Sequence, residues 1–435
     1  MRSIVGLTGP GLASRLALVL VLAPLIGLVA VVAAESVSDT LIAERLLEAR
    51  SARTLGTREY SRSPLDTTTA HHSECVAFSL GLGDIPGTGR VTTALESRTY
   101  RTCPNLAAQL STFETSGTLP AGTPYLRYWH GYSPLTRPAL ALFGVAGTRW
   151  IVFGLLALVM GTVYAGVRRR SGSVAAMLLV APMLLTTDAI IGALSIMQAF
   201  GIGTAWLGGW LCYSMVRRKP TWLVGAFAGA LAGAAASYLD LLTTMPGALT
   251  MSVVGATFGA GTQLAQKPNQ TWRIPLAATG GWSIGMAWMW ASKWLIAMVF
   301  LGSAEVIDDI KGQITFRLSG SHDGVDPSRV LGLSDNIAFW WDRPLTPLVV
   351  FVGLGVIGIW LATRWRSING PGMLSVSLVV TIMAVPHLLW YLLLNNHSQL
   401  HVAIVYRSLP IAFGGLLAWT LAAVSDMTRA RDHVT

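Results

Sequence analysis

Long runs of apolar residues alternate with short polar segments along the chain. A helix needs about 20 consecutive apolar residues to span a bilayer, and most of these runs approach that length. We predict an all-α polytopic membrane protein whose ten spanning helices lie at residues 16–34, 139–167, 173–187, 190–216, 221–238, 246–265, 274–301, 345–363, 371–394 and 403–425. The third and fourth runs are short, so one re-entrant hairpin is the alternative there.

The first apolar run has two interpretations. It ends in Val32-Ala33-Ala34, which resembles the small-residue cleavage site of a secretory signal peptide. The run is nevertheless long for the apolar region of a signal peptide, which covers about 7–15 residues. We therefore favour an uncleaved first helix.

Two long hydrophilic segments divide the chain. The predicted parts are a first helix (1–34), an external domain (35–138), helices two to seven (139–301), a second external loop (302–344), and helices eight to ten with a cytoplasmic tail (345–435). In the external domain, apolar residues recur at helical spacing among charged ones at Leu41, Ile42, Leu46 and Leu47. This pattern predicts an amphipathic helix at 38–53, of the kind that can lie along a membrane surface.

Composition and charge agree with a membrane location. The chain of 435 residues is 52% hydrophobic and 12% charged, with a mean hydropathy of +0.55, which excludes an ordinary soluble protein. Its net charge of +10 comes largely from basic residues in short loops, such as 168–170 and 217–219. This distribution follows the positive-inside rule, so we interpret the charge as topology and expect no nucleic-acid partner. We expect a bacterial inner membrane protein whose active face is extracytoplasmic.

Cys75 and Cys103 lie in the first external segment, whereas Cys212 lies in an apolar run. Disulfides form outside the cytoplasm, so the sequence predicts a Cys75–Cys103 disulfide. Two free thiols are the alternative.

The segment at residues 127–138 contains two arginines, a histidine and three aromatic residues. Trp and Tyr favour the headgroup level, and prolines at 134 and 138 interrupt regular structure. We predict a membrane-interface element followed by a spanning helix from about residue 139. An aromatic belt without chemistry is the alternative, although a belt would not need His130.

Polar residues inside or beside the apolar runs gather on the predicted outer side of the membrane. They are Asp188, Asp240, Lys293, His387, Asn395, Asn396, His397, His401, Tyr406 and Arg407, together with His130 and Arg137. A charged side chain within a bilayer costs at least about 2.5–3.5 kcal/mol, so such residues usually pair or line a cavity. We predict a cavity open to the exterior. The alternatives are snorkelling and a buried Lys293–Asp240 ion pair.

These residue types suit a phosphorylated sugar ligand. Arg and Lys bind phosphate, carboxylates and imidazoles act as general bases, and Trp and Tyr offer flat faces to sugar rings. The sequence contains no Walker A motif and no HExxH motif. His71, His72 and Glu74 resemble a metal cluster, but we expect no metal in this external segment and no obligatory cofactor.

Several motifs resemble those of a group of bacterial polytopic membrane proteins. They are Glu74-Cys75-Val76-Ala77, Arg127-Tyr128-Trp129-His130-Gly131-Tyr132, Ser237-Tyr238-Leu239-Asp240, Met289-Trp290-Ala291-Ser292-Lys293-Trp294, and Asn396-His397-Ser398 with Tyr406-Arg407. The layout also resembles the GT-C glycosyltransferases, which include bacterial arabinofuranosyltransferases. That class uses a polyprenyl-phosphate sugar and an acidic base in the first external loop, which implies Glu35, Asp39, Glu44 or Glu74. The chain lacks the clear acidic pair expected just past the first helix.

The resulting hypothesis is an inverting glycosyltransferase that transfers a sugar, arabinofuranose by analogy of class, to a glycan or protein acceptor. Its donor site would contain Lys293 and Arg407 at the phosphate, with Arg127, Arg137, His397, His401 and Tyr406 nearby. The catalytic candidates are Glu74, Asp39, Glu35 and His130, and the orienting or structural residues are Asp240, Asp188, Trp129, Tyr132, Cys75 and Cys103. The alternatives are a transporter or flippase for a lipid-linked or anionic solute, and a membrane scaffold subunit.

Overall fold

The computed structural model shows an all-α polytopic membrane protein. It describes residues 10–56, 60–62, 68–83, 87–187, 189, 195–240, 242–261, 272–319, 328, 330–364 and 370–432. Within these residues, seven helices are long and apolar enough to cross a membrane, and α7 (Ser173–Thr186) and α10 (Met245–Ala260) are shorter apolar helices. A short antiparallel pair of strands, β1 (Tyr60–Arg62) and β2 (Thr68–Ala70), is also present. The total of ten spanning helices stays a prediction.

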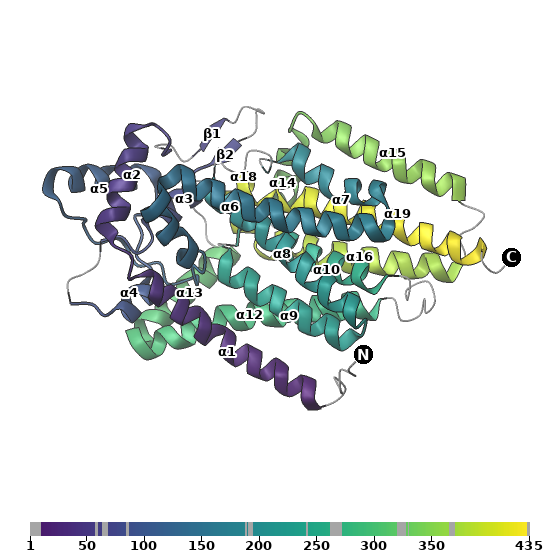
Figure 1. The fold of residues 1–435 in the computed structure, drawn as a ribbon, viewed down its shortest axis with the longest axis horizontal. Coiled ribbons are helices and arrows are strands. Elements are labelled where there is room, and N and C mark those ends of the chain that lie inside the picture. Colours follow the sequence, from purple (N-terminus) through teal and green to yellow (C-terminus); the bar gives the residue numbers. More distant parts are fainter. Residues whose placement is uncertain are drawn as a thin grey trace.

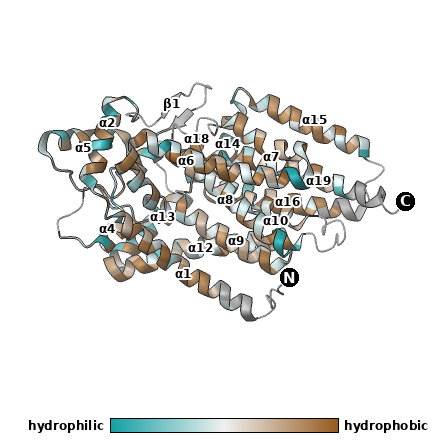
Figure 2. Cartoon of the chain, in the orientation of Figure 1, coloured by the Kyte–Doolittle hydropathy of each residue, from teal (hydrophilic) through white to brown (hydrophobic). Residues whose placement is uncertain are grey.

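The long helices run along the long axis of the molecule (Figure 1). They are α1 (Pro10–Ala34), α6 (Ser133–Ser171), α8 (Ile196–Arg218), α9 (Trp222–Leu239), α12 (Arg273–Leu301), α15 (Thr346–Arg364), α16 (Gly370–Leu393) and α19 (Ser408–Asp432). In the apolar window that includes most of α19, 78% of residues are buried, against 17% in α15. The α15 helix is hydrophobic along much of its length at the edge of the bundle (Figure 2), as expected for a surface that faces lipid.

Several predicted helix boundaries differ from the structure, and two of them bear on the site. The α6 helix begins at Ser133 and not near residue 139, because Pro134 lies in its first turn, where its missing N–H leaves no bond unmade. Regular geometry breaks instead at Gly144, whose φ is 64°. The helix predicted at 403–425 begins only at Ser408, after the short helices α17 (Asn395–Leu400) and α18 (Val402–Val405).

Small residues allow α9 and α12 to pack very closely. A Cβ atom at Gly229 would lie 2.2 Å from the carbonyl oxygen of Ala278, and one at Gly233 would lie 2.0 Å from that of Trp282. Such approach of two backbones is typical of helix pairs in membranes. Because the residue numbers rise together along the contact, the two helices are parallel, in agreement with the predicted topology.

The segment predicted to be external, for which the name external domain is kept, gathers at the end of the bundle opposite to the end of α19 (Figure 1). It contains α2 (Asp39–Ser51), α3 (His72–Ser79), α4 (Arg90–Glu96) and α5 (Cys103–Ser116). The α2 helix confirms the amphipathic prediction: Ser38 caps it by accepting a hydrogen bond from the Leu41 N–H, and Ile42 and Leu46 are fully buried. The second external loop contains α13 (Ser303–Ser319) and α14 (Leu331–Trp341).

Candidate functional site at the outer end of the bundle

The aromatic side chains of the segment before α6 are buried in the protein, so they do not form a belt that faces lipid. The buried side chains of the segment are Tyr128, Trp129, His130 and Tyr132. The Trp129 Nε1–H donates to the carbonyl oxygen of Met289 on α12 at 2.5 Å, and the Gly131 N–H donates to that of Tyr238 on α9 at 2.7 Å. The polar tips of these residues find partners inside the protein, so the segment joins the external domain to α9 and α12.

His130 is a neutral imidazole enclosed by its own segment. Its Nδ1 lies 3.0 Å from the Tyr132 hydroxyl oxygen, and its Nε2 lies 3.2 Å from the carbonyl oxygen of Tyr125. Burial lowers the pKa of His130 to about 3, and the positive charge of Lys293 acts in the same direction. The two distances show that both ring nitrogens have partners within the protein, and the lowered pKa keeps the ring neutral.

Lys293 contacts the end of α4. Its Nζ donates to the carbonyl oxygen of Leu95 at 2.8 Å and lies 5.8 Å from the centre of the Trp129 ring. Carbonyl groups in the last turn of a helix lack partners within the helix, so a cation there is favourable. Asp240 accepts instead from the Thr244 N–H at 2.8 Å, next to the start of α10. These contacts rule out the predicted alternative in which Lys293 pairs with Asp240.

Arg137 holds two of the predicted bases in one buried cluster. Its guanidinium donates to the carbonyl oxygens of Ala34 at 3.0 Å and Leu80 at 2.7 Å, and to the Asp39 carboxylate at 2.6 Å. Glu35 lies 3.5 Å from the same guanidinium. The cluster joins the end of α1 to the start of α2. The Asp39 side chain keeps 23% exposure, whereas that of Glu35 keeps only 5%, so Asp39 is the more accessible carboxylate.

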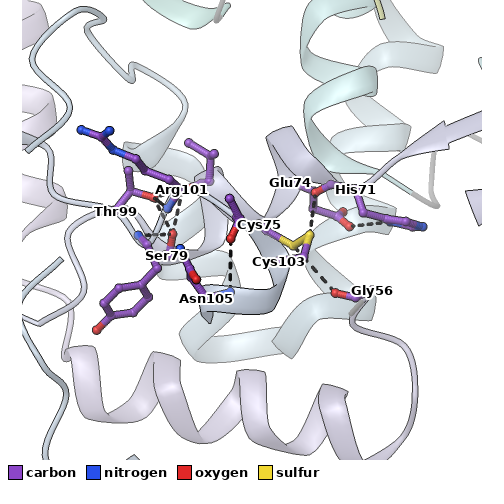
Figure 3. The surroundings of a disulfide bond; sticks show 12 residues. Gly56, His71, Glu74, Cys75, Ser79, Thr99, Arg101, Cys103 and Asn105 are labelled. Carbon is purple, nitrogen blue, oxygen red and sulfur yellow. Dashed lines mark hydrogen bonds and ion pairs between the residues drawn. A yellow bond between two sulfur atoms is a disulfide. The ribbon is translucent and has the colours of Figure 1, made fainter. Parts of the chain in front are cut away.

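Glu74 is held by an arginine that sequence reasoning missed. Both of its oxygens accept hydrogen bonds from Arg149, at 3.0 and 2.6 Å, and one also accepts from the Ile196 N–H at 2.9 Å. Figure 3 shows Glu74 and His71 beside the Cys75–Cys103 disulfide, which confirms the predicted pairing. Burial raises the pKa of Glu74, but the hydrogen bond with His71 and the Arg149 charge outweigh it and hold the pKa below its ordinary value.

The sequence position of Arg149 could have revealed that this arginine has a buried partner. It lies inside the apolar run that forms α6, where an arginine needs a partner. Its third donor group bonds to the carbonyl oxygen of Thr54 at 2.8 Å, so a single guanidinium ties the spanning helix to two parts of the external domain.

A closed cleft, with no room for a water molecule, lies where α3, α8 and the turn before α10 meet the segment that leads into α19. Its lining residues are Ser73, Met197, Gln198, Thr243, Ile404 and Arg407. Arg407 is almost fully buried, with its guanidinium 5.6 Å from the centre of the Tyr406 ring. A guanidinium, two hydroxyls and an amide thus share one cleft, and all of these groups can donate hydrogen bonds to phosphate oxygens.

Histidines border this region. His397 Nε2 lies 3.1 Å from the carbonyl oxygen of Leu242, which precedes Thr243 of the cleft. The His397 and His401 rings lie 4.8 Å apart, and those of His401 and His72 lie 6.4 Å apart. Among the described residues, no group of three or more His, Cys, Asp or Glu side chains is arranged to hold a metal ion.

The remaining predicted site residues are dispersed. Arg127 lies 4.5 Å above the Tyr125 ring, Tyr406 is buried against Phe339, and His387 lies 3.1 Å from the Thr250 hydroxyl. Asp188 falls outside the described residues. The structure therefore divides the predicted site into an Arg407 cleft and separate buried clusters around Arg137, Arg149 and Lys293.

Comparisons with protein-family models, with curated proteins and with solved structures found no match to this chain.

Proposed function

We propose that this chain is a membrane glycosyltransferase that transfers a sugar from a polyprenyl-phosphate donor to a glycan or protein acceptor outside the cytoplasm. The observation that supports the proposal is the Arg407 cleft, in which a buried guanidinium lies with Ser73, Gln198 and Thr243 at the junction between the external domain and the spanning helices. A lipid-linked phosphate lies at such a junction when its chain is in the bilayer and its sugar is outside.

Arg407 is the phosphate-binding residue in this proposal. A guanidinium offers two parallel N–H donors to phosphate, and the charge that develops on the leaving phosphate strengthens both hydrogen bonds during transfer. Lys293, which was expected to share this role, instead has its ammonium on the Leu95 carbonyl and the Trp129 face. We therefore assign Lys293 to holding α4 in place.

Asp39 is the proposed general base. Glu74 is a weaker candidate, because three partners, His71, Arg149 and Ile196, surround its carboxylate and its pKa is lowered. Asp39 lies at the start of α2, directly after the first spanning helix, and its side chain is partly exposed while Arg137 orients it. Because Asp39 belongs to the Arg137 cluster and not to the Arg407 cleft, the transfer step requires these two parts of the protein to come together around the donor. Asp39 then takes the proton of the acceptor hydroxyl as that oxygen attacks the anomeric carbon and the polyprenyl phosphate leaves, which inverts the configuration. The narrow cleft has to widen for the donor to enter.

The test is a transfer assay in liposomes with a radiolabelled polyprenyl-phosphate arabinofuranose and a glycan acceptor. We expect Arg407→Gln and Asp39→Asn to lose at least about a hundredfold in rate, as is typical when an electrostatic or acid–base group is removed. Arg45→Gln, which changes a half-buried arginine of α2 that is not part of the proposed site, is the control and should retain activity.

Full transfer by a folded Arg407→Gln variant would contradict the assignment of the phosphate site. If wild-type protein moves the labelled lipid across the bilayer without forming product, the protein is a transporter and the proposal fails.

A further inference from the structure

A second pocket lies at the opposite, arginine-rich end of the bundle. It has a volume of about 490 Å³ and lies between the ends of α6 and α8. The residues that matter for its chemistry are Thr162 and Arg169 of α6, and Trp210, Tyr213, Arg217 and Arg218 of α8.

The three arginines of this pocket are exposed. The Arg217 guanidinium lies 6.0 Å from the centre of the Tyr213 ring, and the Arg169 Nε–H donates to the carbonyl oxygen of Ala165 at 3.1 Å. Among the described residues that line the pocket there is no carboxylate. The pocket therefore concentrates positive charge, and an anion is the ligand that it favours.

An apolar surface leads into the pocket along both helices. On α6, Leu158, Thr162 and Arg169 follow one another at intervals of four and seven residues, so they lie on one helix face. Trp210 and Arg217 are also seven residues apart, so they lie on one face of α8. Leu158 is 63% exposed and Trp210 is 39% exposed, which places open apolar surface next to the arginines.

We propose that this pocket binds the headgroup of an anionic phospholipid from the leaflet at the arginine-rich end. The phosphate would contact Arg169, Arg217 and Arg218, and an acyl chain would lie along the face that carries Leu158. Basic pockets between spanning helices on the cytoplasmic side are suited to anionic headgroups. A small soluble anion has no apolar group that could cover the exposed apolar face. This inference is independent of the proposed transferase activity.

The experiment compares lipid retention after mild delipidation of protein from phosphatidylcholine nanodiscs that contain some phosphatidylglycerol. The pocket variant carries Arg217→Gln and Arg218→Gln. The matched control, Arg273→Gln with Arg364→Gln, removes the same charge at the starting end of α12 and the terminal end of α15. Retained lipid is quantified by mass spectrometry, and folding is checked by gel filtration.

We expect the pocket variant to retain roughly 25-fold less phosphatidylglycerol than the wild type, because each of the two basic residues near an anionic surface contributes a factor of roughly five in binding. The control should match the wild type, and inorganic phosphate should not displace the lipid. Equal retention in the pocket variant, equal loss in the control, or displacement by inorganic phosphate would each overturn the proposal. If the double variant fails to fold, Arg169→Gln alone supplies the same comparison with a smaller expected loss.

Discussion

Basic side chains are buried at the outer end of the helix bundle and exposed at the opposite end. At the outer end, Arg137, Arg149 and Lys293 keep only 2%, 8% and 0% of their exposure, and each donates to named groups of the external domain. At the other end, Arg217 and Arg218 are exposed. A buried charge requires partners within the protein, so the outer arginines fix how the external domain sits on the helices. Exposed arginines leave that interaction to lipid and solvent.

The largest predicted effect comes from breaking the Arg149–Glu74 pair. Arg149→Met leaves the Glu74 carboxylate buried without its main cation, which costs about 3–5 kcal/mol of stability. Arg218→Met is the matched control at the exposed end and should change little. The measurement is thermal unfolding in detergent, followed by tryptophan fluorescence. Unfolding temperatures lowered equally in both variants would remove the distinction between the two ends.

Loss of the disulfide should have the next largest effect. Replacing Cys75 and Cys103 with serine removes a covalent link between α3 and α5 across a separation of 28 residues. We expect a loss of about 2–5 kcal/mol. Limited proteolysis of the external domain checks this, because cleavage should become faster there while the helix bundle stays intact. Replacement of Cys212 with alanine, which leaves the disulfide intact, is the control. Proteolysis as slow as that of the wild type would show that the buried clusters alone hold the domain.

Acidification should destabilise the outer end selectively. The pKa of His130 is about 3 in the folded protein, against 6.5 for an ordinary histidine, so the unfolded chain binds the extra proton as the pH falls below 6.5. The stability that depends on a neutral His130 is complete above pH 6.5 and is lost towards pH 3. The free energy of unfolding falls by up to about 1.4 kcal/mol per pH unit in this range. The lowered pKa of Glu74 adds a loss of the same sign below its ordinary pKa of 4.5.

The pH prediction is checked by unfolding temperatures between pH 7 and pH 4, for the wild type and for His130→Gln. The variant should be less stable at pH 7 and should show a shallower decline on acidification. Identical slopes would mean that His130 does not remain neutral in the folded protein.

The smallest predicted effect belongs to the ion pair of Arg45, which is half-buried, and Glu48, which is exposed, on α2. Their side chains retain 36% and 64% of their exposure, so the 2.9 Å ion pair is largely solvated. Arg45→Gln should cost no more than about 0.5 kcal/mol. Thermal unfolding at low and high salt measures this. A cost as large as that of Arg149→Met would show that exposure does not separate the two kinds of charge.

The sequence predicted the features that depend on local pattern or on compartment. Apolar periodicity and basic loops located the long helices and α2, and the two cysteines of the external segment predicted the disulfide. It did not predict which polar residues meet, because Arg149 and Glu74 are 75 positions apart and no periodicity links them. For the same reason the burial of Trp129 and the contact of Lys293 with Leu95 were missed. The proposed site moved from a shared Lys293–Arg407 pair to the Arg407 cleft.

The most direct test of the central claim is mass spectrometry of the lipids that copurify with the wild type, Arg407→Gln and Lys293→Met. We expect a polyprenyl phosphate or its glycoside on the wild type, its loss from Arg407→Gln, and its retention on folded Lys293→Met. Only bulk phospholipid on the wild type, or the same polyprenyl species on Arg407→Gln, would contradict the claim that the Arg407 cleft binds the donor.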